Sequence, residues 1–241
     1  MTRPTLKRLQ IAGTVLLLCL SSVIGFAESG NVVGQIEIAK DRSPQAHEMT
    51  QPMSAAIWLT PTGAGAQQIN IPRTNHFRLV QKDKQFTPHL LVVPVGSSVE
   101  FPNLDPFYHN VFSLFNGKRF DLGLYEAGST RTVRFDLEGV SYIFCNIHPE
   151  MGAVIISLTT PYFAMTNANG NWVVRTVPDG TYELNVWAEG VSSRQLQSLK
   201  RQVHIGPATR DLGALHLVED TSLQKHKNKF GEDYFPTVAP Y

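Results

Sequence analysis

The sequence contains very few cysteines, with only Cys19 and Cys145 among its 241 residues. So small a number cannot form the dense disulfide framework of a small secreted scaffold, and that class of protein is excluded. The chain must therefore fold by burying apolar residues. Its length and its 42% hydrophobic content are sufficient for a genuine core.

Long apolar runs are also scarce, and the clearest one, residues 11–24, follows three basic residues near the N-terminus. This arrangement, with the small residues Gly25 and Ala27 before the expected cut, is typical of a secretory signal peptide, so residues 1–27 are predicted to be one. The alternative is an uncleaved anchor, but the run is short for a membrane span. Cleavage would remove Cys19 and leave an exported, periplasmic chain with no stable membrane insertion. Its single cysteine, Cys145, would be either a reactive unpaired thiol or a metal ligand.

Neither sign of charge is in large excess, since 21 basic residues stand against 20 acidic ones. The predicted signal peptide holds three of the basic residues and none of the acidic ones. The exported chain would therefore have a net charge of about −2 with neutral histidines. No basic surface for nucleic acid is indicated.

No segment beyond residue 27 has a sustained helical period, whereas short β-branched and aromatic runs recur between turns rich in Gly, Pro and Asn. This pattern predicts an all-β protein. Asn169-Gly170 suits a tight hairpin, and Pro178-Asp179-Gly180 suits a turn that enters a strand. The predicted strands are residues 31–39, 55–59, 76–80, 90–93, 98–102, 109–114, 131–137, 140–144, 153–158, 172–175, 181–187, 202–205 and 214–218.

The stretch CNIHPEM places Cys145, His148 and Met151 at three-residue intervals. Soft sulfur and imidazole are ligands that copper prefers, and a blue-copper site needs two histidines, one cysteine and usually a distant methionine. His109 is the candidate for the second histidine, because it begins a predicted strand behind a loop. Zinc could use the cysteine and the histidines, but methionine is a poor zinc ligand. Each side chain alone could be core filler or a surface residue, whereas the four together indicate copper.

An ordered set of motifs surrounds these four residues. Residues 86–88 (FTP) and 99–103 (VEFPN) precede residues 109–111 (HNV), and a strand that begins at Gly139 leads to the cysteine. In this order residues 68–158 resemble the cupredoxins, the family of plastocyanin, amicyanin and pseudoazurin. The short C-x-x-H-x-x-M loop, with Pro149 after the histidine, is most similar to that of amicyanin.

The resemblance implies a Greek-key β-sandwich that binds one type 1 copper per chain. It assigns four ligands to the copper: Nδ1 of His109, Nδ1 of His148, the Cys145 thiolate and, as a weak axial ligand, the Met151 thioether. It also implies that the Asn110 N–H tunes the sulfur and that the Asn110 side chain ties the two ligand loops together. The pattern departs from the family at Ser141, where many members have an aromatic residue, and Tyr142 is shifted by one.

Four protein ligands would leave no open position for a substrate, so the resemblance favours a carrier of single electrons and not an enzyme. The single exported cysteine excludes a two-cysteine binuclear centre, and no His-x-His pair is present for a trinuclear oxygen-reducing cluster. Electrons would pass at the edge of His148, beside an apolar docking patch formed by Pro149 and the loop of Pro106, Phe107 and Tyr108. The alternative is that Phe107 and Tyr108 pack inward.

The expected partner is a redox protein such as a c-type cytochrome or an exported dehydrogenase. The overall layout resembles exported cupredoxin proteins of the methylamine-utilisation-like type, although fold and motif do not identify a donor. Two other functions stay open: a periplasmic copper-binding carrier or sensor, and a structural or interaction protein whose metal binding is incidental. The complete set of four predicted ligands, one of them a methionine, favours electron transfer. Copper-storage proteins usually have many Met and His residues, whereas this whole chain has only five Met.

A second module is indicated by residues 166–172 (TNANGNW), 177–184 (VPDGTYEL) and 212–217 (LGALHL), which resemble the transthyretin-like, carboxypeptidase regulatory-like β-sandwich. The strands with which such a module normally opens stand far upstream, within residues 31–62. We therefore expect a discontinuous sandwich of residues 31–62 and 159–218, with the cupredoxin-like residues 68–158 inserted into it. The alternative is that residues 31–59 extend the cupredoxin sheet; contacts between Ile57 and Val186 would favour insertion. Residues 219–241 form a polar tail, expected to wrap the surface or to be disordered.

Overall fold

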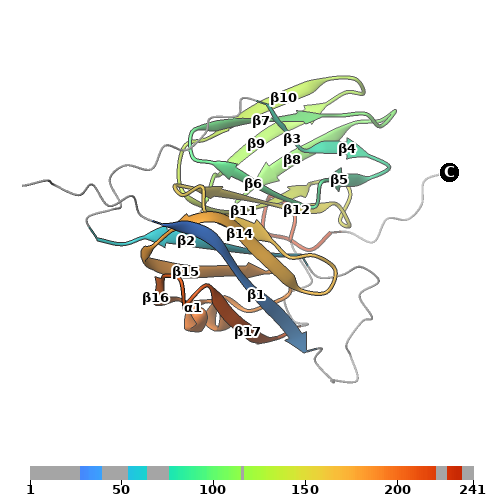
Figure 1. Cartoon of the computed structure of the whole chain (residues 1–241). Helices are drawn as coiled ribbons and strands as arrows, with labels where there is room; N and C mark the ends of the chain where they lie inside the picture. The colour runs from blue at the N-terminus through green and yellow to red at the C-terminus, as the bar shows by residue number, and fades with distance from the viewer. Residues whose placement is uncertain (1–27, 40–53, 64–75, 115–116, 221–226, 235–241) are drawn as a thin grey trace, which may run out of the picture.

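The computed structural model describes residues 28–39, 54–63, 76–114, 117–220 and 227–234. In these residues the chain forms seventeen strands in five sheets and one short helix, which confirms the predicted all-β class. The sheets build two sandwiches that lie one above the other (Figure 1). The predicted signal peptide lies outside the described residues. Within the described ranges, no helix is long and apolar enough to cross a membrane.

The first sandwich is formed by residues 77–158. Its strands are β3 (Phe77–Arg78), β4 (Val80–Lys82), β5 (Gln85–Thr87), β6 (Leu90–Pro94), β7 (Ser97–Pro102), β8 (His109–Ser113), β9 (Phe120–Tyr125), β10 (Thr130–Phe135), β11 (Gly139–Cys145) and β12 (Gly152–Leu158). One sheet has the order β10-β7-β3 and the other β6-β12-β11-β8-β9, while β4 and β5 form a small hairpin. Phe101, Tyr125, Phe135 and Ile143 belong to the core of this sandwich.

The second sandwich combines strands from both ends of the chain. Its strands are β1 (Ser29–Ala39), β2 (Ala55–Pro61), β13 (Phe163–Met165), β14 (Asn171–Pro178), β15 (Gly180–Ala188), β16 (Arg201–Ile205) and β17 (Asp211–Val218). The two sheets have the orders β14-β1-β17 and β13-β2-β15-β16. Ile57 of β2 lies opposite Val186 of β15. Both edges of β1 and of β2 are occupied by these partners, so neither strand extends a sheet of the first sandwich.

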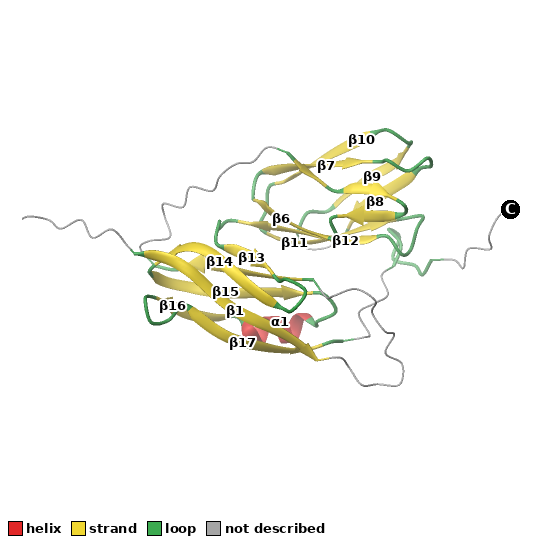
Figure 2. Cartoon of the chain, turned by 45° about the vertical axis from the view of Figure 1, so that its right-hand side comes forward, coloured by secondary structure: helices red, strands yellow, loops and turns green. Residues whose placement is uncertain are grey.

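The two sandwiches face each other through one sheet of each (Figure 2), and an apolar cluster joins these facing sheets. Trp187 of β15 packs against Tyr142 of β11, and the indole Nε1 donates a hydrogen bond of 3.1 Å to the Tyr142 hydroxyl. Ala56, Val154 and Ile156 lie in the same cluster. The second sandwich therefore covers the outer face of the sheet in which β11 lies, and the polar ends of the two aromatic side chains satisfy each other there.

Four elements lie outside the sequence-based prediction: β5, β9, β13 and the helix α1 (Ser193–Leu199). Strand β9 contains Asp121 and Gly123, residue types that are depleted in strands. Helix α1 has seven residues, about two turns, which is too short for a clear periodic signal. None of its residues is fully buried, and only Leu196 and Leu199 pack against the core of the second sandwich.

Both predicted turns are present. Gly170 has a φ angle of 76°, and a Cβ atom at this position would collide with the Ile36 carbonyl oxygen. Glycine is therefore required there, both for the backbone conformation and for the close approach of β1. At the second turn, β14 ends at Pro178 and β15 begins at Gly180, so the chain passes directly from one sheet of the sandwich to the other.

An ion pair at the junction of the sandwiches makes stability depend on pH. His89, just before β6, contacts the Glu189 carboxylate through Nε2 at 2.6 Å and the Gly152 carbonyl through Nδ1 at 3.1 Å. The hydrogen bond to Glu189 raises the pKa of His89; burial opposes this rise, and the charge of Glu189 and the Gly152 carbonyl add to it. A raised folded-state pKa stabilises the fold below the unfolded pKa of about 6.5, and this contribution is lost as pH rises through the folded pKa.

We predict that His89→Gln lowers the free energy of unfolding more at pH 5.5 than at pH 9, when each value is compared with the unchanged protein at the same pH. Urea unfolding at the two pH values measures this difference. His216→Gln is the control, because His216 pairs with Glu37 on the exposed surface, where ion pairs contribute little. An equal loss at both pH values for His89→Gln would contradict the prediction.

Candidate metal centre

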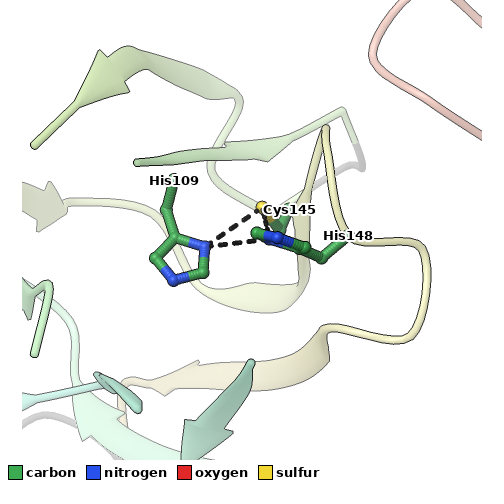
Figure 3. A group of neighbouring side chains, drawn as sticks. All are labelled: His109, Cys145 and His148. Carbon is green, nitrogen blue, oxygen red and sulfur yellow. Dashed lines mark hydrogen bonds between the residues drawn. The ribbon is translucent and has the colours of Figure 1, made fainter. Parts of the chain in front are cut away.

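Three side chains that can bind a metal ion converge where β8 begins and β11 ends (Figure 3). The Nδ1 atoms of His109 and His148 lie 3.2 Å apart, and each lies 3.5 Å from the Sγ atom of Cys145. His109 and Cys145 are fully buried, and His148 is half-buried. Across the described part of the chain, these residues form the one group of three or more His, Cys, Asp or Glu side chains whose ligand atoms all lie within 4.8 Å of one another.

Strand pairing and one tight loop bring the three residues together. Strand β8 is antiparallel to β11 with Val111 opposite Cys145, so His109, the first residue of β8, lies just beyond Cys145 at the same end of the pair. After β11 the chain turns back on itself. The Met151 N–H donates to the His148 carbonyl over 3.0 Å, and the Cys145 N–H donates to the Met151 carbonyl over 3.2 Å. This ligand loop, residues 145–151, places His148 beside His109.

The environment of the sulfur opposes an isolated thiolate. Burial raises the pKa of the Cys145 thiol, and backbone N–H groups of Asn110, Ile147 and His148 partly counteract this rise. Burial lowers the pKa of His148, and the charges of His109 and Lys84 lower it further. The His148 imidazole is therefore held in its neutral form, with a lone pair for a metal. The N–H groups that stabilise the sulfur anion are already in place.

Asp105 orients the His109 ring from the far side. Its carboxylate lies 2.8 Å from His109 Nε2 and also accepts hydrogen bonds from the N–H groups of Asp83 (2.6 Å) and Lys84 (3.1 Å). Burial on its own would raise the pKa of Asp105, but the hydrogen bonds from His109 and from the two backbone N–H groups lower it overall. An ionised carboxylate can only accept, so Nε2 carries the proton. The Nδ1 lone pair of His109 then points into the cluster.

Phe107 packs on both imidazole rings. Its ring centroid lies 5.4 Å from that of His109 and 5.4 Å from that of His148, and the two histidine rings are 4.9 Å apart. The Lys84 ammonium lies 5.6 Å from the Phe107 centroid, on the outer side of the group. The half-buried phenyl ring therefore restricts the histidine rotamers and keeps water away from the cluster.

The distances fit an ion bound by two nitrogens and one sulfur. Metal–nitrogen bonds of about 2.0 Å and metal–sulfur bonds of about 2.3 Å place ligand atoms on a shared ion roughly 3.5 Å apart. Lone pairs that converge in a buried site repel one another unless a proton or a cation lies between them. Met151, the predicted fourth ligand, is fully buried in the same core cluster as Cys145.

The predicted docking residues differ in how they lie. Pro106 and Pro149 are exposed, and Tyr108 is 52% exposed. Phe107 instead packs inward on the histidines, as the alternative interpretation had it for this residue. Pro106 and Tyr108 are thus the exposed sequence neighbours of Phe107, which contacts the His148 ring, and Pro149 is the exposed residue that follows His148.

The Asn110 side chain does not make the expected tie between the ligand loops. Its amide donates to the Asp121 carboxylate over 2.6 Å and to the Gly123 carbonyl over 3.0 Å, both on β9. The reason is the pairing of β8 with β9, in which the register shifts just after Asn110 and leaves room for its side chain. The tie to the ligand loop is made by the Asn110 carbonyl, which accepts from the Asn146 N–H over 2.9 Å.

Two parts of the site were not found by sequence reasoning. Asp105 stands four residues before His109, but a lone carboxylate at this spacing has many other roles and gave no specific signal. Residues 227–234 of the polar tail lie beside the ligand loop, where the Lys229 N–H donates to the Asn146 side chain. A polar segment without periodicity gives no indication of such a contact.

Comparison with known proteins gives structural likeness only. No family model and no curated protein matches the chain. A purple cupredoxin from Nitrosopumilus maritimus is 24% identical over 34% of this chain and 99% of its own, with a TM-score of 0.31. A copper-containing nitrite reductase from Thermus scotoductus SA-01 is 24% identical over 41% of this chain and 25% of its own, with a TM-score of 0.33. A variant of amicyanin in its Cu(I) form is 18% identical over 44% of this chain and 99% of its own, with a TM-score of 0.33. At these scores the likenesses do not assign a function.

We predict that Asp105→Asn weakens the binding of Cu(II) by about 10–100-fold, because it removes the charged acceptor that fixes the His109 ring. Competition with a chelator of known affinity measures the change. Asp136→Asn is the matched control, since Asp136 is an exposed carboxylate paired with Lys118 in the turn before β11. If both variants bind Cu(II) as tightly as the unchanged protein, Asp105 does not position the ligand.

Proposed function

We propose that this chain is an exported type 1 (blue) copper protein that transfers single electrons between redox partners and is not an enzyme. One copper per chain would be held by Nδ1 of His109, Nδ1 of His148 and the Cys145 thiolate, with Met151 as a weak axial ligand. The observation that carries the proposal is the approach of the two imidazole nitrogens and the sulfur to within 3.2–3.5 Å of one another in a buried site.

Copper suits these donors better than zinc does. Soft thiolate and thioether ligands favour Cu(I), imidazole suits both oxidation states, and methionine is a poor zinc ligand. When bound, copper would supply a one-electron couple between Cu(I) and Cu(II). The fully buried position of Met151 in the core beside Cys145 supports its place in the set.

The surrounding residues support electron transfer through their rigidity. Asp105 holds the His109 ring, and three backbone N–H groups are directed at the Cys145 sulfur. Phe107 packs on both histidine rings and limits the access of water. Ligands held in this way would change little between two oxidation states, and four protein ligands would leave no position for a substrate.

The exposed surface beside His148 supports a docking role. His148 is half-buried and contacts Phe107, which is flanked in the sequence by the exposed residues Pro106 and Tyr108. A small apolar surface of this kind suits a transient redox partner, such as a c-type cytochrome or an exported dehydrogenase. A donor of the methylamine-utilisation type would be one such dehydrogenase.

Two other functions can be distinguished by experiment. A copper carrier or sensor would bind the metal without rapid electron exchange, and a structural protein would bind it weakly or not at all. The preformed convergence of the ligands favours an electron carrier over a structural protein, because such a cluster is difficult to explain by packing alone. Export to the periplasm is proposed from the sequence of residues 1–27.

Adding Cu(II) to the protein without residues 1–27 is expected to give an intense blue thiolate-to-copper absorption band, and Cys145→Ser is expected to abolish it. His204→Ala is the control, because His204 is an exposed strand residue of the second sandwich. A colourless protein, or colour that persists in Cys145→Ser, would refute the copper-redox proposal. A blue protein that exchanges electrons slowly with small cytochromes would indicate the carrier or sensor.

Tyr108→Glu is expected to slow electron exchange with a small c-type cytochrome by about 3–10-fold while leaving the blue absorption band unchanged, since it adds a charge to the docking surface and not to the ligands. Stopped-flow mixing measures the rate. Leu137→Glu adds the same charge to a side chain that is 60% exposed in the turn at the opposite end of β11. Equal rates for the two variants would exclude the docking surface.

A further inference from the structure

The ligand loop is contacted by a segment close to the C-terminus, residues 227–234 (Figure 1, red). The Tyr234 hydroxyl donates a hydrogen bond of 2.9 Å to the carbonyl of Cys145. The Lys229 N–H donates a hydrogen bond of 2.9 Å to the Asn146 side-chain oxygen. Two successive residues at the start of the ligand loop are thus held by a segment more than eighty residues away in the sequence.

The same segment also reaches the strand behind His109. The Lys229 ammonium lies 2.8 Å from one oxygen of the Asp121 carboxylate, and the other oxygen accepts the Asn110 side-chain N–H over 2.6 Å. Asn110 follows His109, and its carbonyl accepts the Asn146 N–H. The contacts therefore close a ring that runs from the ligand loop through Lys229 and Asp121 to Asn110 and back to the loop.

Residues 227–234 are held in shape by their own hydrogen bonds. The side-chain oxygen of Asn228, a residue only 9% exposed, accepts the N–H groups of Phe230 (2.9 Å) and Glu232 (3.0 Å). The Asn228 N–H donates to the Glu232 carbonyl over 2.9 Å. A segment that is already folded loses little conformational entropy when it binds the loop, so its two contacts can act as fixed restraints.

The ligand loop needs such a restraint more than the strands do. Ile147, Pro149 and Glu150 are exposed, so packing holds the loop on one side only. Cys145 ends a strand whose position is fixed by its neighbours, whereas His148 depends on the conformation of the loop that follows. A bond to the Cys145 carbonyl and a bond to the Asn146 side chain fix the direction in which the chain leaves β11.

We propose that residues 227–234 are a strap that positions the ligand loop, with Tyr234 and Lys229 as positioning residues for the metal centre. The proposal rests on the proposed function for its effect on copper. Its effect on the loop does not depend on the metal, because both contacts are made to the protein. Removing the Tyr234 hydroxyl releases the Cys145 carbonyl, and removing the Lys229 ammonium releases Asp121 and loosens the ring around Asn110.

Tyr234→Phe and Lys229→Met test the strap, with Tyr182→Phe as the matched control. The Tyr182 hydroxyl also donates to a backbone carbonyl, that of Pro178, over 2.8 Å, but in the second sandwich. Tyr234→Phe is expected to raise the Cu(II) dissociation constant about tenfold and to alter the electron paramagnetic resonance spectrum of the bound copper. Lys229→Met is also expected to raise the Cu(II) dissociation constant and to alter the electron paramagnetic resonance spectrum. The control is expected to lose a similar amount of thermal stability and to change neither.

Amide hydrogen exchange in the copper-free protein separates failure of the strap from failure of the proposed function. Tyr234→Phe is expected to speed exchange at Asn146 and Met151 about threefold or more relative to Tyr182→Phe, because the loop opens more often. Faster exchange in a protein that gives no blue complex would retain the strap and refute the proposed function. Exchange rates and copper constants that match those of the control in both strap variants would overturn the strap.

Discussion

In the antiparallel pair β8–β11, Val111 lies opposite Cys145 and Phe112 lies opposite Phe144. Because side chains alternate between the two faces of a sheet, a slip of one residue would move Cys145 from the inner face to the outer face. The ligand loop would not compensate for such a slip, since Phe144 or Asn146, depending on its direction, would take the place of Cys145 opposite Val111. The register of this one strand pair therefore determines whether the three ligand atoms meet at all.

The second sandwich helps to maintain that register. Along β11 the side chains of Ile143 and Cys145 join the core of the first sandwich, whereas Tyr142 joins the cluster that faces Trp187. The positions of Ser141 and Tyr142 have their explanation here. Ser141 points inward, where its hydroxyl accepts the Lys118 N–H, and the aromatic residue is shifted to the face that the second sandwich covers. One face of β11 is thus buried and the other half-buried, each against a different set of partners.

Sequence patterns predicted the strands and ligand residues whose signals lie within a short stretch of the chain. The spacing of Cys145 and His148 within one loop, and the position of His109 at the start of a strand, were sufficient to select three side chains that the fold brings together. Strand β9 was missed because Asp121 and Gly123 within it are residue types depleted in strands, and because its pairing with β8 comes from the tertiary fold. Asp105 and residues 227–234 were missed because their roles depend on contacts that no periodicity encodes. For the Lys229–Asp121 pair, those contacts span 108 residues.

The pairing of β1 with β17 sets an order in which the chain can fold. Val33 pairs with Asp211 in this parallel contact. Among the described strands, β2 gains its first partner with β13 and β1 gains its first partner with β14, so neither is paired until residues 163–178 have been synthesised. Residues 77–158, in contrast, contain both sheets of the first sandwich and can close as soon as they emerge. While they do so, the first two strands present unpaired edges, which are sites at which other chains can add. The nascent protein thus carries its greatest risk of aggregation in its earliest strands and not in the sandwich that carries the metal ligands.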